Sequence, residues 1–332
     1  MEIRCFQAAD LSSVGKLWEE CRKRGEILLR PFNADYFTRK FVDNGCFDRE
    51  LMLLGFEADE PVGLIFGVRK HEFLNREDES NTPGFITLLL VAPEHRNKGI
   101  GSALLARLED EFRRLGKKNL DVSFLSPINL DWLIPGTPGH GHNNMPGMDT
   151  DSMGYGFLTR KGYRTTVCEV AMYLNLSDYQ KSDIVEEKRK ALKEQGIIAG
   201  LYDPNEKCEW DGMCDRVGSE YWRKVLKDEL SSPSPRPILA ARTNGHIVGF
   251  TGPVDVEESG RGWFTGICTD PLYEQRGIAT VLFNDLMGEF IKAGAQFSSL
   301  FTGTDNHAQR LYLRTGFRPA RQFANMRKEL WT

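Results

Sequence analysis

The sequence predicts two α/β domains of similar topology, each built on a mixed sheet. The first observation is an internal repeat, because VAPEHRNKGIG, which begins at Val91, returns as TDPLYEQRGIA from Thr269, 178 residues further on. The second is that both copies are embedded in the same order of apolar segments. The third is size: 332 residues with 40% hydrophobic and 27% charged residues suffice for two domains that each bury a core.

Each copy predicts a strand, a helical region, a hairpin, an apolar strand, a glycine turn that opens a helix, another strand and a last helix. In the first copy these segments lie at residues 3–7, 11–24, 51–70, 85–93, from Ser102 onward, 119–124 and 156–163. In the second copy they lie at 196–202, 220–230, 237–253, 263–271, from Thr280 onward, 297–303 and 307–317. Asn244-Gly245 in the second hairpin is a strong two-residue turn signal.

The first copy carries an insertion that the second lacks. Gly99 and Gly162 are 63 residues apart, whereas Gly277 and Gly316 are 39 apart, so about 24 extra residues fall near 127–152. Pro, Gly, Asn and His are dense there, so neither a long helix nor a long strand can run through it. Its Trp, Leu, Ile and Met residues favour a packed lid or pocket wall.

Composition excludes several classes of protein. The formal charge of −4, with Lys and Arg scattered among Asp and Glu, gives no general attraction to nucleic acid or anionic lipid. The first residues do not form a signal peptide, and no apolar run approaches the ~20 residues of a spanning helix. The seven cysteines form no C-x-x-C pair. We therefore expect a soluble cytoplasmic protein with structural thiols, no metal site, and a monomeric or homodimeric state.

The glycine turns predict an anion site. A turn between a strand and a helix, with glycine at positions 99 and 101, presents backbone N–H groups at the positive end of the helix dipole, where phosphate binds. Neither turn matches the P-loop pattern G-x-x-x-x-G-K-[ST], and the third glycine of a dinucleotide fingerprint is missing.

Around these turns the sequence resembles the GNAT family of acyl-CoA-dependent N-acyltransferases, whose signature at a strand–turn–helix junction is Q/R-x-x-G-x-G/A. Residues 96–101 fit it completely, and residues 274–279 fit except that Glu274 replaces Arg or Gln. The resemblance covers nearly the whole chain outside the insertion. It implies two tandem GNAT-like domains, 1–175 and 183–332, that form a pseudo-dimer in one chain.

By this resemblance the turns hold the pyrophosphate of acetyl-CoA, the co-substrate. The implied coenzyme-binding residues of the first copy are Val91, Arg96, Asn97, Lys98, Gly99, Ile100, Gly101 and Ser102. Those of the second copy are Ile267, Thr269, Gln275, Arg276, Gly277, Ile278, Ala279, Thr280 and Asn306. If the Glu274 side chain pointed inward, its carboxylate would repel an anion. We therefore expect weaker coenzyme binding at the second turn than at the first.

The resemblance also implies a catalytic residue. Many family members protonate the leaving thiolate with a Tyr four residues before the Gly of a G-F motif, and Tyr312 stands at this position before Gly316. The first copy has Leu158 there, and Tyr155 could substitute only if the helix were shifted. We therefore expect catalysis in the C-terminal domain. A core aromatic on an amphipathic helix is the alternative interpretation of Tyr312.

The general base stays open, because neither central strand carries an acid. Asp255, Glu257, Glu258 and His307 are candidates in the second copy, although exposed surface charge is the simpler interpretation. In the first copy the insertion offers an acidic, aromatic-lined pocket for an amine, and its candidates are Trp132, His140, His142, Asp149 and Asp151. His140 and His142 lack an obvious third ligand for a metal.

The predicted function is acetyl transfer from acetyl-CoA to a primary amine of a small molecule by direct attack. Two alternatives remain at this point. The N-terminal domain can be the catalytic one, with the acceptor bound beside the insertion, or the protein can be a non-catalytic sensor that binds acyl-CoA.

Overall fold

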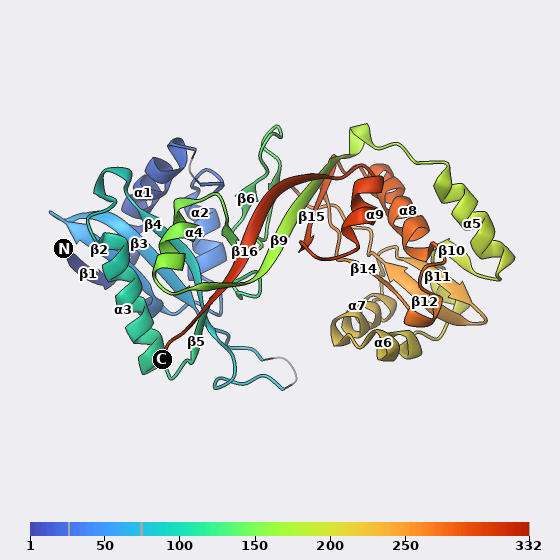
Figure 1. Cartoon of the computed structure of the whole chain (residues 1–332), viewed down its shortest axis with the longest axis horizontal. Helices are drawn as coiled ribbons and strands as arrows, with labels where there is room; N and C mark the ends of the chain where they lie inside the picture. Colours follow the sequence, from blue (N-terminus) through green and yellow to red (C-terminus); the bar gives the residue numbers. More distant parts are fainter. Residues whose placement is uncertain (26, 74–75, 332) are drawn as a thin grey trace. The chain divides into compact units, whose positions relative to one another are not determined.

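The computed structural model describes residues 1–25, 27–73 and 76–331, and the chain forms two compact units (Figure 1). Unit 1 comprises residues 1–171 and 320–332, and unit 2 comprises residues 172–319. The predicted domains, 1–175 and 183–332, follow the order of the repeats along the chain. They differ from the compact units at the C-terminal strand, which belongs to unit 1 because it pairs with strands of that unit.

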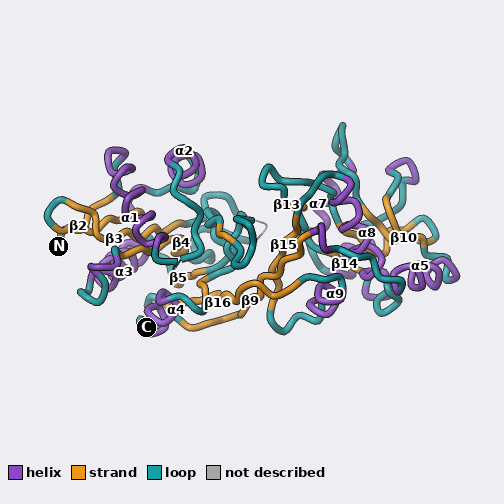
Figure 2. The backbone as a smooth tube through the Cα atoms, turned by 90° about the horizontal axis from the view of Figure 1, so that it is seen from above, coloured by secondary structure: helices purple, strands orange, loops and turns teal. Residues whose placement is uncertain are grey.

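Unit 1 is built on a mixed sheet. Its strands are β1 (Glu2–Cys5), β2 (Met52–Glu57), β3 (Glu60–Val68), β4 (Gly84–Val91), β5 (Asn119–Val122), β8 (Met148–Asp149), most of β9 (Arg164–Asn175) and most of β16 (Arg318–Glu329). In the same unit, β6 (Trp132–Leu133) and β7 (Gly141–His142) form a separate two-stranded sheet. The order is β1-β2-β3-β4-β5-β16, followed by β9, and the views of Figures 1 and 2 agree on β9 beside β16. Only β4 and β5 are parallel among the neighbours from β1 to β16.

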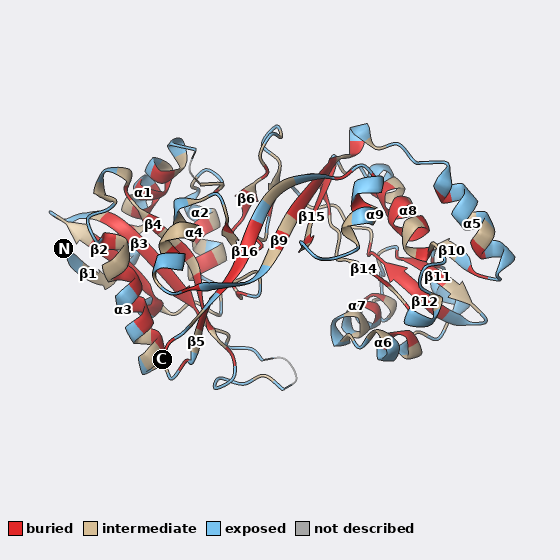
Figure 3. Ribbon diagram, in the orientation of Figure 1, coloured by how far each residue is buried: buried red, intermediate tan, exposed pale blue. Residues whose placement is uncertain are grey.

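Helices cover both faces of this sheet. They are α1 (Leu11–Lys23), α2 (Ala34–Phe37), α3 (Ile100–Arg114) and α4 (Met153–Arg160). One core joins Trp18 and Phe37 to Leu88 and Leu90, and the other joins the apolar face of α3 to β5 and Leu158. Figure 3 shows that the helices bury the side that faces the sheet and expose the other. Amphipathic helices on a half-buried sheet are what the apolar periodicity predicts.

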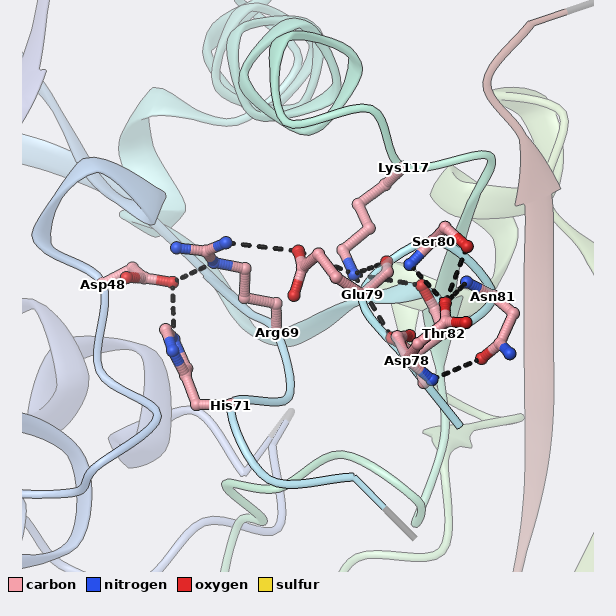
Figure 4. Close-up of polar contacts among 9 residues, drawn as sticks. All are labelled: Asp48, Arg69, His71, Asp78, Glu79, Ser80, Asn81, Thr82 and Lys117. Carbon is pink, nitrogen blue, oxygen red and sulfur yellow. Dashed lines mark hydrogen bonds and ion pairs between the residues drawn. The ribbon is translucent and has the colours of Figure 1, made fainter. Parts of the chain in front are cut away.

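The connection before β4 is tied down by a buried lysine. The ammonium of Lys117 donates to the carbonyls of Glu79 and Thr82 at 2.7 and 3.2 Å and pairs with the Glu79 carboxylate at 3.0 Å (Figure 4). Arg69 links this group to Asp48, because it donates to both Asp48 and Glu79. These contacts fix the start of the central strand.

Unit 2 repeats the general order of helices and strands of unit 1, but its strands do not form one continuous sheet. Its helices are α5 (Ile184–Glu194), α6 (Asp211–Val217), α7 (Glu220–Leu230), α8 (Ile278–Lys292) and α9 (Gln309–Arg314). Its strands are β10 (Ile198–Leu201), β11 (Leu239–Thr243), β12 (His246–Thr251), β13 (Arg261–Gly262), β14 (Ile267–Thr269) and β15 (Phe297–Gly303). The sheet β10-β11-β12-β14 is separate from the pairing of β13 with β15.

The second central strand is therefore broken, whereas the sequence predicts one continuous strand at 263–271. Residues 263–266 leave the strand conformation, and Gly266 has a φ of +131° with the Trp222 ring beside it. A Cβ at Gly266 would lie 2.6 Å from that ring. The Trp222 ring of α7 therefore packs against the residue at which the strand is interrupted.

The repeat itself is confirmed in three dimensions. α3 and α8 each have 15 residues, and the parallel pairing of Gly84 with Leu120 returns as Gly262 with Ser298 at the same offset of 178 residues. Both helices begin two residues before the positions that the sequence suggests. Among the described residues, no helix is both long and apolar enough to cross a membrane.

Candidate functional site

The two central strands of unit 1 diverge. In the described chain, β4 and β5 pair only at Gly84–Leu120 and Phe85–Asp121. On its other side, β4 has a shift in register that leaves Thr87 without a partner on β3. The Thr87 hydroxyl contacts the Ser126 hydroxyl at 3.0 Å and the Ile128 carbonyl at 3.1 Å. Because the strands diverge, a gap opens between β4 and β5. The irregularity at Thr87 turns the backbone N–H and C=O groups there away from the regular ladder of β3 and β4.

The glycine turn follows β4 after one short 3-10 turn, Pro93–His95. Asn97 and Gly99 both have left-handed backbones, with φ of 60° and 88°, and α3 begins at Ile100. The first N–H groups of a helix have no acceptor within the helix, and the first turn of α3 contains no acidic side chain. A Cβ built on Gly99 would meet no atom within 4 Å, so the turn is open on that side.

A cavity of about 810 Å³ connects these features within unit 1. Its lining includes β4 residues 86–91, the turn and helix start, the segment 145–149 of the insertion, and one side of α4. Seven of the eight residues predicted for the first coenzyme site line it; they are Val91, Arg96, Asn97, Gly99, Ile100, Gly101 and Ser102. The eighth, Lys98, is exposed beside the turn.

Basic side chains outnumber acidic ones along the cavity. Arg96, Arg160 and Lys161 line it, and they favour a polyanion such as a nucleotide. Asp149 is the only acid among the described lining residues. Between these charged groups the walls are largely leucine, isoleucine and methionine, as expected of a small-molecule site.

The insertion is a folded wall of this cavity, as its composition indicates. β6 and β7 form a small hairpin in which Trp132 pairs with His142, and β8 pairs with β16. Trp132 is buried, donates to the Asn144 carbonyl at 3.2 Å, and packs edge-on against Phe323. Leu130, Met145 and Asp149 from this segment line the cavity. His140 has a lowered pKa because burial disfavours its charged form.

The second glycine turn has the same backbone but different surroundings. Gln275 and Gly277 repeat the left-handed pair, with φ of 60° and 98°. A Cβ at Gly277 would lie 2.9 Å from Cδ of Lys188, which projects from α5. Arg276 lies over the Tyr273 ring and donates to the Gln195 side chain at 3.3 Å. A helix of the chain itself therefore covers the second turn.

The remaining residues predicted in the second copy occupy several environments. Ile267 and Thr269 lie in β14, Ile278 is buried at the start of α8, Ala279 and Thr280 are half-buried beside it, and Glu274 is exposed. Asn306 donates to the Thr302 hydroxyl at 2.9 Å and accepts from the backbone of Ala308. Of the candidate bases, Asp255 binds Arg236 and Glu257 binds Arg261.

Tyr312 lies in an aromatic cluster of unit 2. Its ring centroid is 5.1 Å from that of Phe283 and 5.9 Å from that of Phe264, and the residue is 5% exposed. Burial raises the pKa of Tyr312 to about 12. A phenol in these surroundings stays protonated, which suits both a core aromatic and a proton donor. In unit 1, Leu158 is fully buried, and the Tyr155 hydroxyl contacts Thr165 at 3.2 Å.

Sequence reasoning missed several residues of these surroundings. Thr87, Ser126, Lys188 and Arg321 carry no motif, and their positions follow from strand register, helix placement and the path of the last strand. Alternation within β4 could have suggested Thr87 as an exception in an apolar run. The other three depend on contacts between segments that are distant in the sequence.

Comparisons with protein families and with known proteins agree with the duplicated architecture and with the family resemblance of the sequence. The family model described as Acetyltransferase (GNAT) family matches residues 17–129 and 205–317, more than half of the chain. An acetyltransferase of Sodalis glossinidius is 35% identical over 122 residues, which are 37% of this chain and 74% of that protein. An acetyltransferase of Yersinia enterocolitica is 31% identical over the same shares.

Solved structures share the fold along the whole chain. A GCN5-related N-acetyltransferase from Sphaerobacter thermophilus has a TM-score of 0.61 and 20% identity, over 99% of this chain and 95% of that one. A tandem GNAT protein from the clavulanic acid biosynthesis pathway has a TM-score of 0.56 and 15% identity, over 100% and 99%. A fungal enzyme with a glucosamine N-acetyltransferase region has a TM-score of 0.67 and 15% identity, and this chain spans 38% of its length. The chain belongs to the GNAT family of acetyltransferases, with two such domains in tandem.

Proposed function

We propose that the protein transfers the acetyl group of acetyl-CoA to a primary amine of a small molecule, and that unit 1 performs the reaction. The observation that carries this proposal is the cavity of about 810 Å³, where the open glycine turn, the gap between β4 and β5 and the wall formed by the insertion meet. The sequence assigns catalysis to Tyr312 in the other unit. We favour unit 1 because Lys188 covers the second turn.

The residues present in unit 1 fit a coenzyme A thioester. The N–H groups at the start of α3 suit the pyrophosphate, and Arg96, Arg160 and Lys161 add positive charge around the cavity. The gap between the diverging strands suits the extended pantetheine arm, because strand edges there offer backbone groups that the sheet does not use.

The proposed chemistry is direct attack. The neutral amine forms a bond to the thioester carbonyl carbon, the carbon–sulfur bond breaks, the amine loses a proton to solvent or a base, and the thiolate takes up a proton. The backbone at the Thr87 irregularity is the proposed donor to the carbonyl oxygen. Most of the rate gain would come from holding amine and thioester together in the cavity.

Unit 2 then has a supporting role in this proposal, and its coenzyme site would be weak or absent. We also infer a reducing compartment such as the cytoplasm, because none of the seven cysteines, all of which the structure describes, is in a disulfide bond. A small-molecule acceptor is favoured over a protein because the insertion walls one side of the cavity, which limits the size of what can enter.

Two measurements test the proposal. Calorimetric titration of acetyl-CoA into wild type should give one site per chain, lost in Gly99→Glu and kept in Gly277→Glu, with circular dichroism to check folding. A panel of glucosamine, spermidine, L-lysine methyl ester and a short peptide with a free N-terminus should show acetylation of a small amine. Loss of binding in Gly277→Glu alone would move the site to unit 2. Binding without turnover of any amine would favour an acyl-CoA sensor.

A further inference from the structure

The last strand of the chain forms the support of the cavity wall in unit 1. β8 pairs with β16 at Asp149–Phe323 and Met148–Ala324. The backbone N–H and hydroxyl of Thr150 both donate to the Gln322 carbonyl at 3.2 Å. The end of the insertion is thus held by residues that follow it by more than 170 positions.

The approach between these two segments is close. A Cβ at Gly147 would lie 2.5 Å from the Ala324 carbonyl oxygen, so only glycine lets the wall reach the strand. On the same strand, Phe323 packs against Trp132 with ring centroids 5.0 Å apart. Because Gly147 and Met148 line the cavity, the position of β16 sets the position of this wall.

One side chain of β16 reaches Asp149, the one acid among the described residues that line the cavity. Nε and Nη2 of Arg321 donate to the two carboxylate oxygens of Asp149 at 2.8 and 2.9 Å. Nη1 of Arg321 pairs with Asp151 at 2.8 Å. Asp149 is 6% exposed, so its carboxylate is shielded from solvent although Arg321 is half-buried, and the bidentate contact fixes the plane of that carboxylate.

Asp149 in turn fixes the start of α4. Its carbonyl accepts from the Ser152 hydroxyl at 2.6 Å and from the Ser152 backbone at 3.0 Å. Ser152 caps α4 by accepting from the backbone of Tyr155. Residues 152–154 line the cavity, so a shift of Asp149 would move two of its walls together.

We propose that Arg321 is a positioning residue of the acceptor site: it holds the Asp149 carboxylate, and with it the wall 145–152 against which the amine binds. The inference rests on the proposed function of unit 1. Arg321 contacts neither amine nor thioester in this proposal, and its effect passes through Asp149. The turn 96–102 belongs to a different wall, and Arg160 and Lys161 lie at the end of α4 farthest from Ser152, so we expect coenzyme binding to change little when Arg321 is replaced.

The chain supplies a matched control on the same strand. Nε and Nη2 of Arg327 donate to the carboxylate of Asp121 at 2.8 and 2.7 Å, in the same bidentate geometry. Asp121 is as buried as Asp149, but neither Asp121 nor Arg327 lines the cavity. Arg327→Ala therefore removes an equivalent ion pair of unit 1 without touching the acceptor wall.

The test compares the full-length variants Arg321→Ala, Arg321→Lys and Arg327→Ala, with the small amine that wild type acetylates best among glucosamine, spermidine and L-lysine methyl ester. We expect Arg321→Ala to raise the amine KM at least tenfold while the acetyl-CoA Kd stays within twofold. Arg321→Lys should recover part of the KM, and Arg327→Ala should stay within twofold of wild type in both. Hydrogen exchange in residues 145–152 should accelerate in Arg321→Ala only.

Other outcomes decide against the inference. Equal KM changes in Arg321→Ala and Arg327→Ala, or an unchanged KM in a folded Arg321→Ala protein, would overturn it. If Arg321→Ala does not fold, Arg321→Lys and Asp149→Asn carry the same comparison. If wild type binds acetyl-CoA but acetylates none of the amines, the proposed function fails. Faster exchange in 145–152 confined to Arg321→Ala would then still support the positioning role, and equal exchange would overturn it.

Discussion

Gly84 lies directly against the ring of Phe112, because a Cβ built on Gly84 would be 2.4 Å from that ring. The same relationship returns between Gly262 and Phe290, where the distance would be 2.6 Å. Gly84 and Gly262 are also the residues at which the two central strands of each unit still pair. In both units the long helix therefore packs on its sheet at the point from which the strands diverge.

This contact predicts that Gly84→Ala destabilises unit 1. The added methyl group must displace the Phe112 ring, which is fully buried, and overpacking of this kind costs about 1–3 kcal/mol. Urea unfolding monitored by circular dichroism measures the loss. Phe112→Leu should partly restore Gly84→Ala, because it removes the ring that the new methyl group meets.

Gly288→Ala is the matched control. Gly288 lies inside α8, and a Cβ there would meet no atom within 4 Å. The same substitution should therefore stabilise unit 2 by roughly 0.5–1 kcal/mol through helix propensity. Equal effects of Gly84→Ala and Gly288→Ala would contradict the packing argument.

Tyr312→Phe distinguishes the two assignments of the reaction. If unit 1 performs the transfer, loss of this hydroxyl in the aromatic cluster of unit 2 should change kcat less than about threefold, because the ring packing is retained. If the phenol protonates the leaving thiolate, kcat should fall by about 10²–10⁴-fold, as for the loss of a general acid. Steady-state kinetics with acetyl-CoA and the preferred amine measure kcat, and Tyr155→Phe is the comparison in unit 1.

Lys117→Met should destabilise the segment that leads into β4. Lys117 is 1% exposed, and the substitution leaves the carbonyls of Glu79 and Thr82 without their donor. The contact with the Thr82 carbonyl is buried, and a buried carbonyl that loses its partner costs about 1–3 kcal/mol. Lys118→Met is the control, since Lys118 is exposed next to it in the chain. Urea unfolding of both variants tests this, and comparable midpoints would show that the buried contacts contribute little.

The sequence predicts the duplicated core of this fold because local signals determine it. The glycine turns around Gly99 and Gly277 and the helices after them agree with the structure, as does the apolar strand before Gly99, whereas the strand before Gly277 is shorter than expected. Such features depend on residues within one supersecondary unit. The insertion is also predicted by its own residues: its apolar side chains indicate packing, and Trp132 is buried in the structure.

The partner of the last strand could not be predicted in the same way. Residues 318–329 show no regular alternation of apolar and polar side chains, and nothing local indicates that they pair with β5. The contact of Arg321 with Asp149 depends on that pairing, so it is invisible in the sequence. The cover of Gly277 by Lys188 likewise depends on where α5 packs. The assignment of a site to one copy therefore needed the structure.

Glu169, on β9, has a buried carboxylate. We expect it to make unit 1 less stable as the pH rises. The residue is 7% exposed, and within the described ranges no group donates a hydrogen bond to its carboxylate. Burial raises the pKa of Glu169 above its ordinary value, because the charged form loses its hydration. The folded state then binds the proton more tightly than the unfolded state, so unit 1 loses stability as the pH rises from the ordinary pKa of glutamate through the raised one.

Glu169→Gln should remove this cost. We expect the variant to be more stable than wild type at pH 7, by about 1 kcal/mol or a Tm increase of roughly 2–4 °C, and nearly equal to wild type at pH 4. Glu109→Gln is the control, because Glu109 is equally buried but bound by Lys328 at 2.8 Å, so its substitution should destabilise at pH 7. Thermal unfolding at pH 4, 5.5 and 7 measures both variants. A Glu169→Gln protein that is less stable than wild type at pH 7 would mean that the carboxylate has a favourable partner in solution.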